Sequence, residues 1–347
     1  MRTTTDGAIG VAHSDAPRPG AIVLMSPTIF ERVWGPAERR RLAKRLDVIG
    51  TPGADLGRYT PEQLASAQFL ITGWGAPPLD GLPAMPNLKL VLHAAGSVRS
   101  LATPEFWRRG IPVVSAIEEN TRPTAEFASA EIVYALKRGW HAAARLRRTR
   151  DWDASLPSSG IVGSTVGLVS LGRVGRLVAA RLASIGGIRI LAFDPYSDAV
   201  PGVEFVDLNR LFEESDVVSL HTPITPETVG LVGEAQLRSL KEGATLINTS
   251  RGAIIDEAAL VRTLRARPDL FAALDVTESE PLAPDSALYD LENVILTPHI
   301  AGSSGRELHA LAHAVMDQYD LHRRGALVRS VGADDRPIAV RLAPTAG

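Results

Sequence analysis

Short runs of aliphatic and β-branched residues alternate with amphipathic helical patterns along most of the chain. The first run, at residues 21–25, is typical of a buried strand, and residues 36–46 follow it with the pattern of a basic helix. Residues 60–63, Thr-Pro-Glu-Gln, form a capping box with proline at the first helical position. Further strands are predicted at 69–71, 88–92 and 111–114. This alternation indicates a parallel α/β unit that ends near Asn120.

A second series of strands follows one long helix, which the pattern predicts at 123–150. Its strands are predicted at 166–170, 188–193, 217–220, 245–248, 270–274 and 294–296, with helices between the earlier ones. Strands and helices in this order suit a doubly wound, dinucleotide-binding Rossmann domain. The last helix, at about 304–324, comes after that sheet is complete, so we expect it to return to the first unit.

The chain is therefore predicted to be an α/β protein with two doubly wound parallel-sheet domains. A Rossmann domain, 122–302, is expected to be inserted in a discontinuous flavodoxin-like domain, 21–121 and 303–332. Two domains suit 347 residues, because a single core stops growing at roughly 250–300 residues. Residues 1–20 are expected to be a disordered leader and residues 333–347 a flexible tail.

The amino-acid composition excludes several classes of ligand and of binding site. The net charge of −2 argues against a general nucleic-acid binder, which needs a basic excess. Cysteine is absent, which excludes disulfides, thiolate metal sites and cysteine nucleophiles, and no His/Asp/Glu grouping has metal-ligand spacing. The chain also shows no secretory signal and no apolar stretch near the roughly 20 residues of a membrane span. We expect a cytoplasmic protein.

A nucleotide-binding fingerprint lies at the strand-to-helix turn after 166–170. It reads Ser170-x-Gly172-x-x-Gly175, where the usual pattern begins with glycine. Asp194 ends the next predicted strand, at the distance expected of the carboxylate that binds the adenosine ribose. No Arg or Lys follows between 195 and 201, so the sequence predicts NAD rather than NADP as the cofactor. The alternative is a glycine-rich turn and an aspartate that caps a strand end.

Three further segments each follow a predicted strand, on the edge where α/β sheets bind ligands. They are 246–252 (Leu-Ile-Asn-Thr-Ser-Arg-Gly), 273–281 (Ala-Leu-Asp-Val-Thr-Glu-Ser-Glu-Pro) and 296–302 (Leu-Thr-Pro-His-Ile-Ala-Gly). Together with 215–228 and 256–260, they resemble the signatures of the D-isomer-specific 2-hydroxyacid dehydrogenase family. The resemblance is strong over 160–306 and fainter over 85–135.

The resemblance implies a catalytic set. Arg251 would hold the carboxylate of a 2-oxo acid and polarise its carbonyl, His299 would act as general acid and base, and Glu280 would hydrogen-bond His299. The roles suit the chemistry, because hydride transfer to a ketone builds negative charge that a cation and a proton donor stabilise. Taken alone, Arg251 is typical of a surface ion pair and His299 of a structural residue. Glu278 is a local rival to Glu280.

The resemblance also implies cofactor contacts. Arg173 and Val174 would meet the pyrophosphate, Thr222 and Pro223 would line the adenosine side, and Thr249 and Asp275 would approach the nicotinamide. Asp275 suits a strand-end cap equally well. The full cofactor set is Gly172, Arg173, Val174, Gly175, Asp194, Thr222, Pro223, Thr249, Asp275 and Gly302.

The substrate side departs from the family pattern. Its glycine-rich turn reads Ala-Gly-Ser-Val-Arg-Ser over 95–100, without the second glycine and the Asp-Asn that are common there. Gly96, Ser97 and Val98 are expected to offer backbone N–H groups to the substrate. Arg99 is either a surface charge or an additional anion contact. Trp74, in a strand-end loop between glycines, is either a wall of the pocket or a packing anchor.

The function expected from these features is reversible hydride transfer between NADH and a 2-oxo acid. The family also implies a homodimer, with the helix that begins near Pro123 as a plausible contact. Two alternatives remain: an NAD-sensing binding protein or corepressor of the same fold, and an NAD enzyme acting on a substrate that is not an acid.

Overall fold

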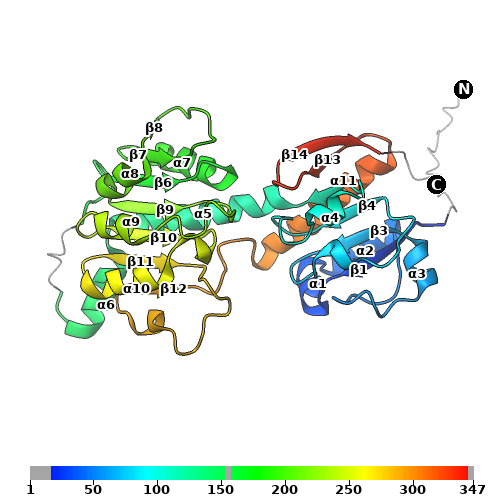
Figure 1. Ribbon diagram of the computed structural model, residues 1–347, viewed down its shortest axis with the longest axis horizontal. Coiled ribbons are helices and arrows are strands. Elements are labelled where there is room, and N and C mark those ends of the chain that lie inside the picture. Colours follow the sequence, from blue (N-terminus) through cyan, green and yellow to red (C-terminus); the bar gives the residue numbers. More distant parts are fainter. Residues whose placement is uncertain (1–16, 153–157, 343–347) are drawn as a thin grey trace, which may run out of the picture. The chain divides into compact units, whose positions relative to one another are not determined.

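The computed structural model describes residues 17–152 and 158–342, which form two compact units (Figure 1). Unit 1 takes the described residues up to Ile117 and from Gly305 onward, and unit 2 takes Glu118–Ser304. The sequence had placed these two boundaries at 121/122 and 302/303. Most of the expected leader lies outside the described residues, and the first strand begins at Gly20.

Unit 1 is built on a sheet in the order β14-β13-β5-β4-β3-β1-β2. Strands β1 to β5 run parallel in the flavodoxin order 2-1-3-4-5, and β13 joins β5 antiparallel. Their bounds are β1 Gly20–Leu24, β2 Asp47–Val48, β3 Ala67–Thr72, β4 Leu90–His93, β5 Val113–Ser115, β13 Leu327–Val331 and β14 Pro337–Arg341.

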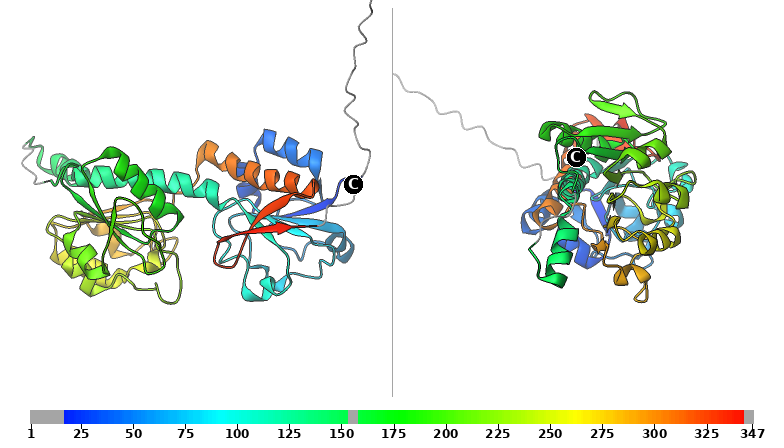
Figure 2. Two further views of the ribbon diagram at one scale, coloured as in Figure 1. Left: turned by 90° about the horizontal axis from the view of Figure 1, so that it is seen from above. Right: turned by 90° about the vertical axis from the view of Figure 1, so that its left-hand side faces the viewer.

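Helices cover both faces of this sheet (Figure 2). α1 (Pro27–Val33), α2 (Pro36–Arg45) and α11 (Leu308–Arg323) bury Phe30, Leu42 and Tyr319 against one face. α3 (Pro61–Ser66), the 3-10 turn η1 (Leu79–Gly81) and α4 (Pro104–Trp107) contribute to the core on the other face. The capping box predicted at α3 is present, since the Thr60 N–H donates to Gln63 Oε1 at 2.9 Å. α11 follows the last strand of unit 2 and packs in unit 1, as the sequence predicted.

Unit 2 has the parallel sheet β12-β11-β10-β9-β6-β7-β8. Numbered within the unit, the order is 3-2-1-4-5-6 with one more strand, β12, at the edge, so this is a Rossmann arrangement. The bounds are β6 Thr165–Val169, β7 Arg189–Phe193, β8 Val203–Phe205, β9 Val217–Leu220, β10 Thr245–Asn248, β11 Phe271–Leu274 and β12 Val294–Leu296. The predicted fold class is confirmed, and β8 is an addition to the predicted strands.

The helices of unit 2 form two layers. α5 (Ile117–Leu136) and α7 (Arg173–Ile185) pack on one face, and α8 (Leu208–Glu214), α9 (Glu234–Ser239) and α10 (Glu257–Ala266) pack on the other. The remaining elements are α6 (Gly139–Thr149) and the 3-10 turns η2 (Gly252–Ile254), η3 (Ala287–Asp290) and, at the start of the second segment of unit 1, η4 (Gly305–Glu307). No helix in the described ranges is long and apolar enough to span a membrane.

Two element predictions were wrong. The single helix expected at 123–150 is two helices, α5 and α6, which part at Arg138, where φ is +50°. The Arg138 guanidinium donates to the Asp269 carbonyl at 2.8 Å, a contact 131 residues away that helps to hold the break. Gly139 follows directly and is the local signal for a helix end that the prediction passed over. The tail expected to be flexible from 333 instead contains β14, which pairs along its length with β13. Residues 343–347 lie outside the described range.

Candidate active site

The nucleotide fingerprint lies between β6 and α7, and each of its small residues meets a separate demand. Ser170 has φ +77°, the left-handed conformation that glycine adopts without strain. A Cβ on Gly175 would stand 2.2 Å from the Ser170 carbonyl oxygen, so only glycine fits. A Cβ on Gly172 would meet nothing closer than 4.0 Å. Gly172 therefore leaves its backbone open to a ligand, while Gly175 lets the helix pack on the turn.

The N-terminus of α7 suits an anion. Gly172 is its N-cap and has no side chain to satisfy the first N–H groups of the helix. These donors and the helix dipole favour a phosphate at this end. Val174 packs against the core shared by α5 and α7, and the Arg173 side chain ion-pairs with Glu118 at 2.7 Å. The Arg173 guanidinium is thus anchored to α5 beside the turn.

Asp194 follows β7 and is bonded to the fingerprint itself. Its carboxylate accepts the Leu171 N–H at 2.7 Å and the Ser170 hydroxyl at 3.2 Å, so the serine that replaces the first glycine ties the turn to this aspartate. A carboxylate has further acceptor capacity for ribose hydroxyls. The structure also brings Arg176 of α7 to Ser197, at 2.7 Å, just beyond Asp194. The sequence analysis missed this cation because it considered only residues 195–201, and Arg176 lies in α7, before that segment.

Buried polar atoms without partners lie on the same edge of the sheet. The Thr249 hydroxyl, after β10, and both ring nitrogens of His221, after β9, have no hydrogen-bond partner within the described residues. Burial lowers the pKa of His221 to about 4. The Thr222 hydroxyl donates to the Val169 carbonyl at 3.2 Å, and the Pro223 carbonyl accepts the Thr228 hydroxyl at 2.7 Å. Unpaired buried groups are costly, so this edge fits a polar ligand such as a dinucleotide; His221 was not among the predicted contacts.

His299 occupies a strained backbone position after β12. Its φ is +54°, uncommon for a residue other than glycine. The loop is held by Asp275, whose buried carboxylate accepts the Thr297 hydroxyl at 2.6 Å and the N–H groups of Ile300 and Ala301 at 2.8 and 2.9 Å. The His299 N–H donates to the Asp275 carbonyl at 2.9 Å. Asp275 therefore orders the loop that presents the imidazole.

Glu280 and His299 meet although they are 19 residues apart. Glu280 Oε2 lies 2.6 Å from His299 Nδ1, and both side chains keep solvent access, 39% and 49% exposed. Nε2 is the ring nitrogen of His299 that Glu280 does not hold. Glu278, the rival, instead donates its backbone N–H to the Glu257 carboxylate at 3.0 Å.

Arg251 lies in the turn after β10, beside the Glu280 loop. Asn248 shapes this turn by donating to the Arg251 carbonyl at 2.9 Å and accepting the Ser250 N–H at 3.0 Å. A Cβ on Gly252 would stand 1.9 Å from the Thr277 carbonyl carbon, so the two loops pack backbone to backbone. The Arg251 side chain is exposed and donates only to its neighbour, the Ser250 carbonyl, among the bonds described. The arrangement holds Arg251 near the loop of the histidine–glutamate pair.

Two features of α5 bear on the same region. Asn120 accepts the Ser303 N–H at 2.9 Å, and a Cβ on Gly302 would meet the Asn120 side chain at 3.0 Å. Glu131 is buried, and its Oε2 has no hydrogen-bond partner in the described residues. Burial and the neighbouring charge of Asp275 raise the pKa of Glu131 to about 8. This carboxyl therefore keeps its proton at neutral pH.

The predicted substrate turn lies in unit 1, between β4 and α4. The Ser115 hydroxyl fixes it by donating to the Gly96 carbonyl at 2.5 Å. Val98, expected to offer its N–H to substrate, donates it to Asp335 at 2.8 Å, so the structure gives that group another partner. Arg99 ion-pairs with Asp335 at 3.1 Å. Trp74 is partly buried against the core of unit 1, in keeping with a packing anchor.

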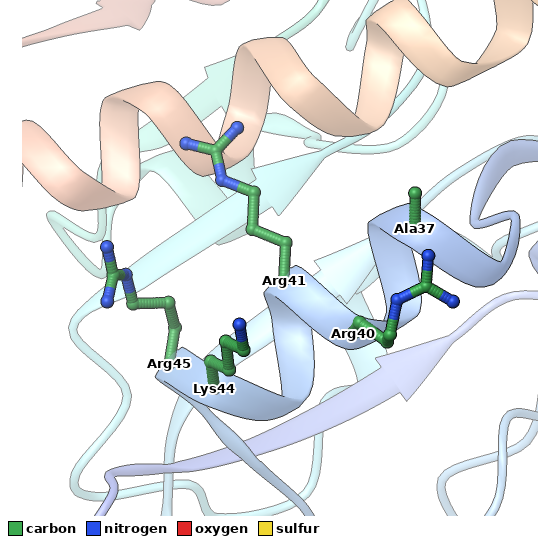
Figure 3. A pocket seen from close by; sticks show the side chains of 5 residues that line it. All are labelled: Ala37, Arg40, Arg41, Lys44 and Arg45. Atoms are coloured by element: carbon green, nitrogen blue, oxygen red, sulfur yellow. The ribbon is translucent and has the colours of Figure 1, made fainter.

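A surface hollow elsewhere in unit 1 is lined by Ala37, Arg40, Arg41, Lys44 and Arg45 (Figure 3). Arg41 points toward α11, where it pairs with Asp317 at 2.6 Å and Asp320 at 2.9 Å. These charges fasten α2 to α11, and the hollow shares no residue with the candidate site. No group of three or more metal-ligating side chains occurs in the described ranges.

A dinucleotide fingerprint on a Rossmann sheet, with a histidine–glutamate pair and an arginine on the ligand-binding edge, defines a nicotinamide-dependent oxidoreductase. Comparison with known proteins places it further. Residues 130–301 match the family profile of the D-isomer specific 2-hydroxyacid dehydrogenases, NAD binding domain. Glyoxylate reductase from Korarchaeum cryptofilum is 37% identical over 253 residues, 70% of this chain and 76% of that protein. The chain belongs to the D-isomer specific 2-hydroxyacid dehydrogenase family.

Solved structures agree with this assignment. NADPH-dependent glyoxylate/hydroxypyruvate reductase from Sinorhizobium meliloti superposes with a TM-score of 0.75 at 26% identity, covering 94% of this chain and 100% of that one. D-lactate dehydrogenase from Aquifex aeolicus, solved with NAD and lactic acid, gives a TM-score of 0.71 at 25% identity, covering 88% and 96%. Both the family and the NAD-binding, D-2-hydroxyacid oxidoreductase class predicted from the sequence are confirmed.

Proposed function

We propose that this enzyme reversibly reduces a small 2-oxo acid to the D-2-hydroxy acid with NADH, using Arg251, His299 and Glu280. The observation that carries the proposal is the 2.6 Å contact between His299 Nδ1 and Glu280 on the ligand-binding edge. The contact leaves Nε2 to serve the substrate oxygen. Relatives that act on glyoxylate, hydroxypyruvate and lactic acid support a small substrate.

Each residue has a separate role in the proposed reaction. The bound cofactor supplies the hydride. Arg251 binds the substrate carboxylate through its exposed guanidinium and polarises the adjacent carbonyl, because a fixed cation stabilises the negative charge that develops on oxygen. His299 donates a proton from Nε2 to that oxygen during reduction and takes it back during oxidation. Glu280 orients the imidazole and stabilises its charged form.

The cofactor is proposed to be NAD rather than NADP. Asp194 places a carboxylate beside the fingerprint turn, where it would accept the ribose hydroxyls and repel a 2′-phosphate. Arg176, bonded to Ser197 nearby, is the group that would receive such a phosphate once the carboxylate is gone. Asp194→Ala should therefore raise the ratio of kcat/KM for NADPH over NADH by at least about tenfold. An unchanged ratio in this variant would show that Asp194 does not select the cofactor.

The alternative of an NAD-sensing protein without turnover is less well supported. A sensor has no use for a proton donor, yet His299 is held in a strained conformation with a carboxylate on its Nδ1. Backbone strain of this kind, held by its surroundings, is typical of active sites.

The direct test is NADH oxidation, followed at 340 nm, across glyoxylate, hydroxypyruvate, pyruvate, phenylpyruvate and branched 2-oxo acids. Turnover of at least one acid, with the D-hydroxy acid as product on a chiral column, is the expected result. Tight NADH binding with no turnover of any acid would contradict the proposed activity and favour the sensor.

We further propose a homodimer formed through unit 2. α6 has no buried residue, and Trp152 and Val162, which flank the following segment, are 85% and 82% exposed. Apolar side chains that gather into one exposed patch typically mark a protein contact. Near the end of α5, Tyr134 is 45% exposed and packs edge to face against Trp140 of α6, with the ring centroids 5.0 Å apart.

A further inference from the structure

The carboxyl group of Glu131 lies on the face of α5 that packs against the sheet of unit 2. Ala128 and Ala135, three residues before it and four after it, are buried in the core that α5 and α7 form with that sheet. Glu131 itself is 9% exposed, and its Oε2 has no hydrogen-bond partner among the described residues. An ionisable group therefore lies among apolar core residues, where burial disfavours its charged form.

α5 runs alongside β11 in the opposite direction. Trp140, which follows α5, stacks on Phe271 at the start of β11, with the ring centroids 5.6 Å apart. In the first turn of α5, Asn120 accepts the Ser303 N–H at 2.9 Å, in the loop beyond β12. Glu131 lies between these two contacts along the helix, which places it toward the carboxyl end of β11.

Asp275 projects from that end of β11 to the face that α5 covers. Its N–H donates to the Asn248 carbonyl at 3.0 Å, so the ladder between β10 and β11 continues to Asp275. Side chains alternate along a strand, and Ala273, two residues before Asp275, packs in the core shared with α5. Burial and then the charge of Asp275 raise the pKa of Glu131 to about 8. The two carboxyl groups therefore interact, and Glu131 holds a proton at neutral pH.

The other charged groups on the elements around Glu131 are paired or neutral. Two side chains of α7 form ion pairs with α5, Arg173 with Glu118 and Arg181 with Glu126. His221, after β9, is neutral because burial lowers its pKa to about 4. His299, in the loop after β12, is bonded to Glu280. In the part of the chain that the structure describes, Asp275 is thus the charge that an ionised Glu131 would meet.

Resting on the function proposed above, we infer that Glu131 is a positioning residue, whose neutral carboxyl lets Asp275 hold the loop that presents His299. The Asp275 carboxylate accepts three hydrogen bonds from that loop, 297–301, and an ionised acceptor makes such bonds strong. When Glu131 loses its proton, two like charges share one buried site, so one of them must move or take up a proton. Either response weakens the bonds to the loop. Glu131 acts through Asp275, without contact with the reacting atoms.

The test follows the oxidation of D-lactate, D-glycerate and glycolate by NAD⁺ at 340 nm between pH 7 and 9.5. In this direction His299 acts as a base, so the loss of its own proton does not lower the rate. The wild-type kcat should fall about tenfold between pH 8.5 and 9.5 as Glu131 ionises. In Glu131→Gln it should change less than about twofold over the same interval, because the amide has the shape of the protonated carboxyl and cannot ionise.

Glu126→Gln is the matched control. Glu126 lies on the same helix, but its carboxylate is exposed and pairs with Arg122 at 2.9 Å, so its kcat should fall with pH as in the wild type. A fall of the same size in Glu131→Gln would show that Glu131 serves packing alone, which overturns the inference. A wild-type kcat that stays constant up to pH 9.5 overturns it as well. If Glu131→Gln does not fold, Glu131→Met takes its place.

A second measurement needs no turnover. Hydrogen exchange of the segment 297–303, followed by mass spectrometry, reports on the Ile300 and Ala301 N–H groups that Asp275 accepts. The ratio of the wild-type exchange rate to that of Glu131→Gln should rise at least about fivefold from pH 7 to 9.5, because the ionised pair frees the loop. A constant ratio overturns the inference. A rising ratio in a protein that oxidises none of the three acids supports the role of Glu131 in the loop and contradicts the proposed function alone.

Discussion

His299 has an unfavourable backbone conformation, which fixes the position of its imidazole. A residue other than glycine at φ +54° costs of order 1–3 kcal/mol, and surrounding bonds must hold it there. Asp275 supplies them through its carboxylate contacts with Thr297, Ile300 and Ala301. Asp275 therefore holds the loop that carries His299 in its strained conformation.

Glu280 and Glu278 give a matched pair of variants that tests the role of Glu280. Glu280→Gln removes the charged partner of His299 Nδ1, so kcat should fall about 10- to 100-fold while the dissociation constant of NADH changes less than twofold. Glu278→Gln should retain near-wild-type kcat, because the bond that Glu278 makes to Glu257 comes from its backbone N–H and not from its side chain. Equal losses in the two variants, measured by steady-state kinetics at 340 nm, would remove the special role of Glu280.

Residues of the candidate site could be predicted from the sequence where their place next to a predicted strand marks them. Arg251, Glu280 and His299 each follow a predicted strand, and parallel strands bring their carboxyl ends to one edge of the sheet. Arg176 carries no such signal, since it lies within a helix. His221 does follow a predicted strand, but only its unpaired, buried ring nitrogens in the structure mark it as a candidate ligand contact. The contact of Asp335 with Val98 was out of reach, because it depends on a hairpin that the sequence analysis took for a tail.

Among the elements, α5 carries an acidic group into the interior of unit 2. Glu131 has its pKa raised to about 8 by burial and by Asp275, whereas in the unfolded chain it ionises near 4.5. Between these two values the folded state keeps a proton that the unfolded state has lost. This group's contribution to stability is therefore greatest below pH 4.5 and declines as the pH rises to about 8.

Glu131→Gln should remove this pH dependence. The variant should gain stability over the wild type as the pH rises from 5 to 8.5, by up to roughly 4 kcal/mol, because an amide has no proton to lose. Urea unfolding at several pH values measures the difference. A difference in the free energy of unfolding that stays constant across this range would contradict a buried, protonated Glu131.

The predicted bounds of helices and strands agree with the structure where local capping and burial set them. They differ where contacts with distant parts of the chain set them. The capping box of α3 and the strands β9, β10 and β12 lie where the pattern put them. At the break between α5 and α6 the Arg138 side chain bonds to the distant Asp269 carbonyl, and the helical periodicity of the sequence runs through Gly139, the one local sign of the break. β8 is a short edge strand of three residues with no fully buried position, too weak a pattern to identify.

For the whole molecule, the proposed dimer makes a prediction about mass. The 37.0 kDa chain should sediment as a dimer at micromolar concentration. Trp152→Asp should weaken it by placing a charge on the apolar surface beside α6, whereas Tyr289→Asp, on the exposed η3 turn, should not. Wild-type protein that sediments as a monomer would exclude the dimer, and equal weakening by both substitutions would exclude this surface.

The measurement that tests the central claim most directly compares the wild type with His299→Ala on the best 2-oxo acid found. We expect kcat to fall at least about 100-fold while NADH still binds within twofold of the wild-type dissociation constant, because His299 is proposed to transfer the proton and the fingerprint turn lies on other elements. A loss of less than about tenfold in kcat would contradict His299 as the general acid and base.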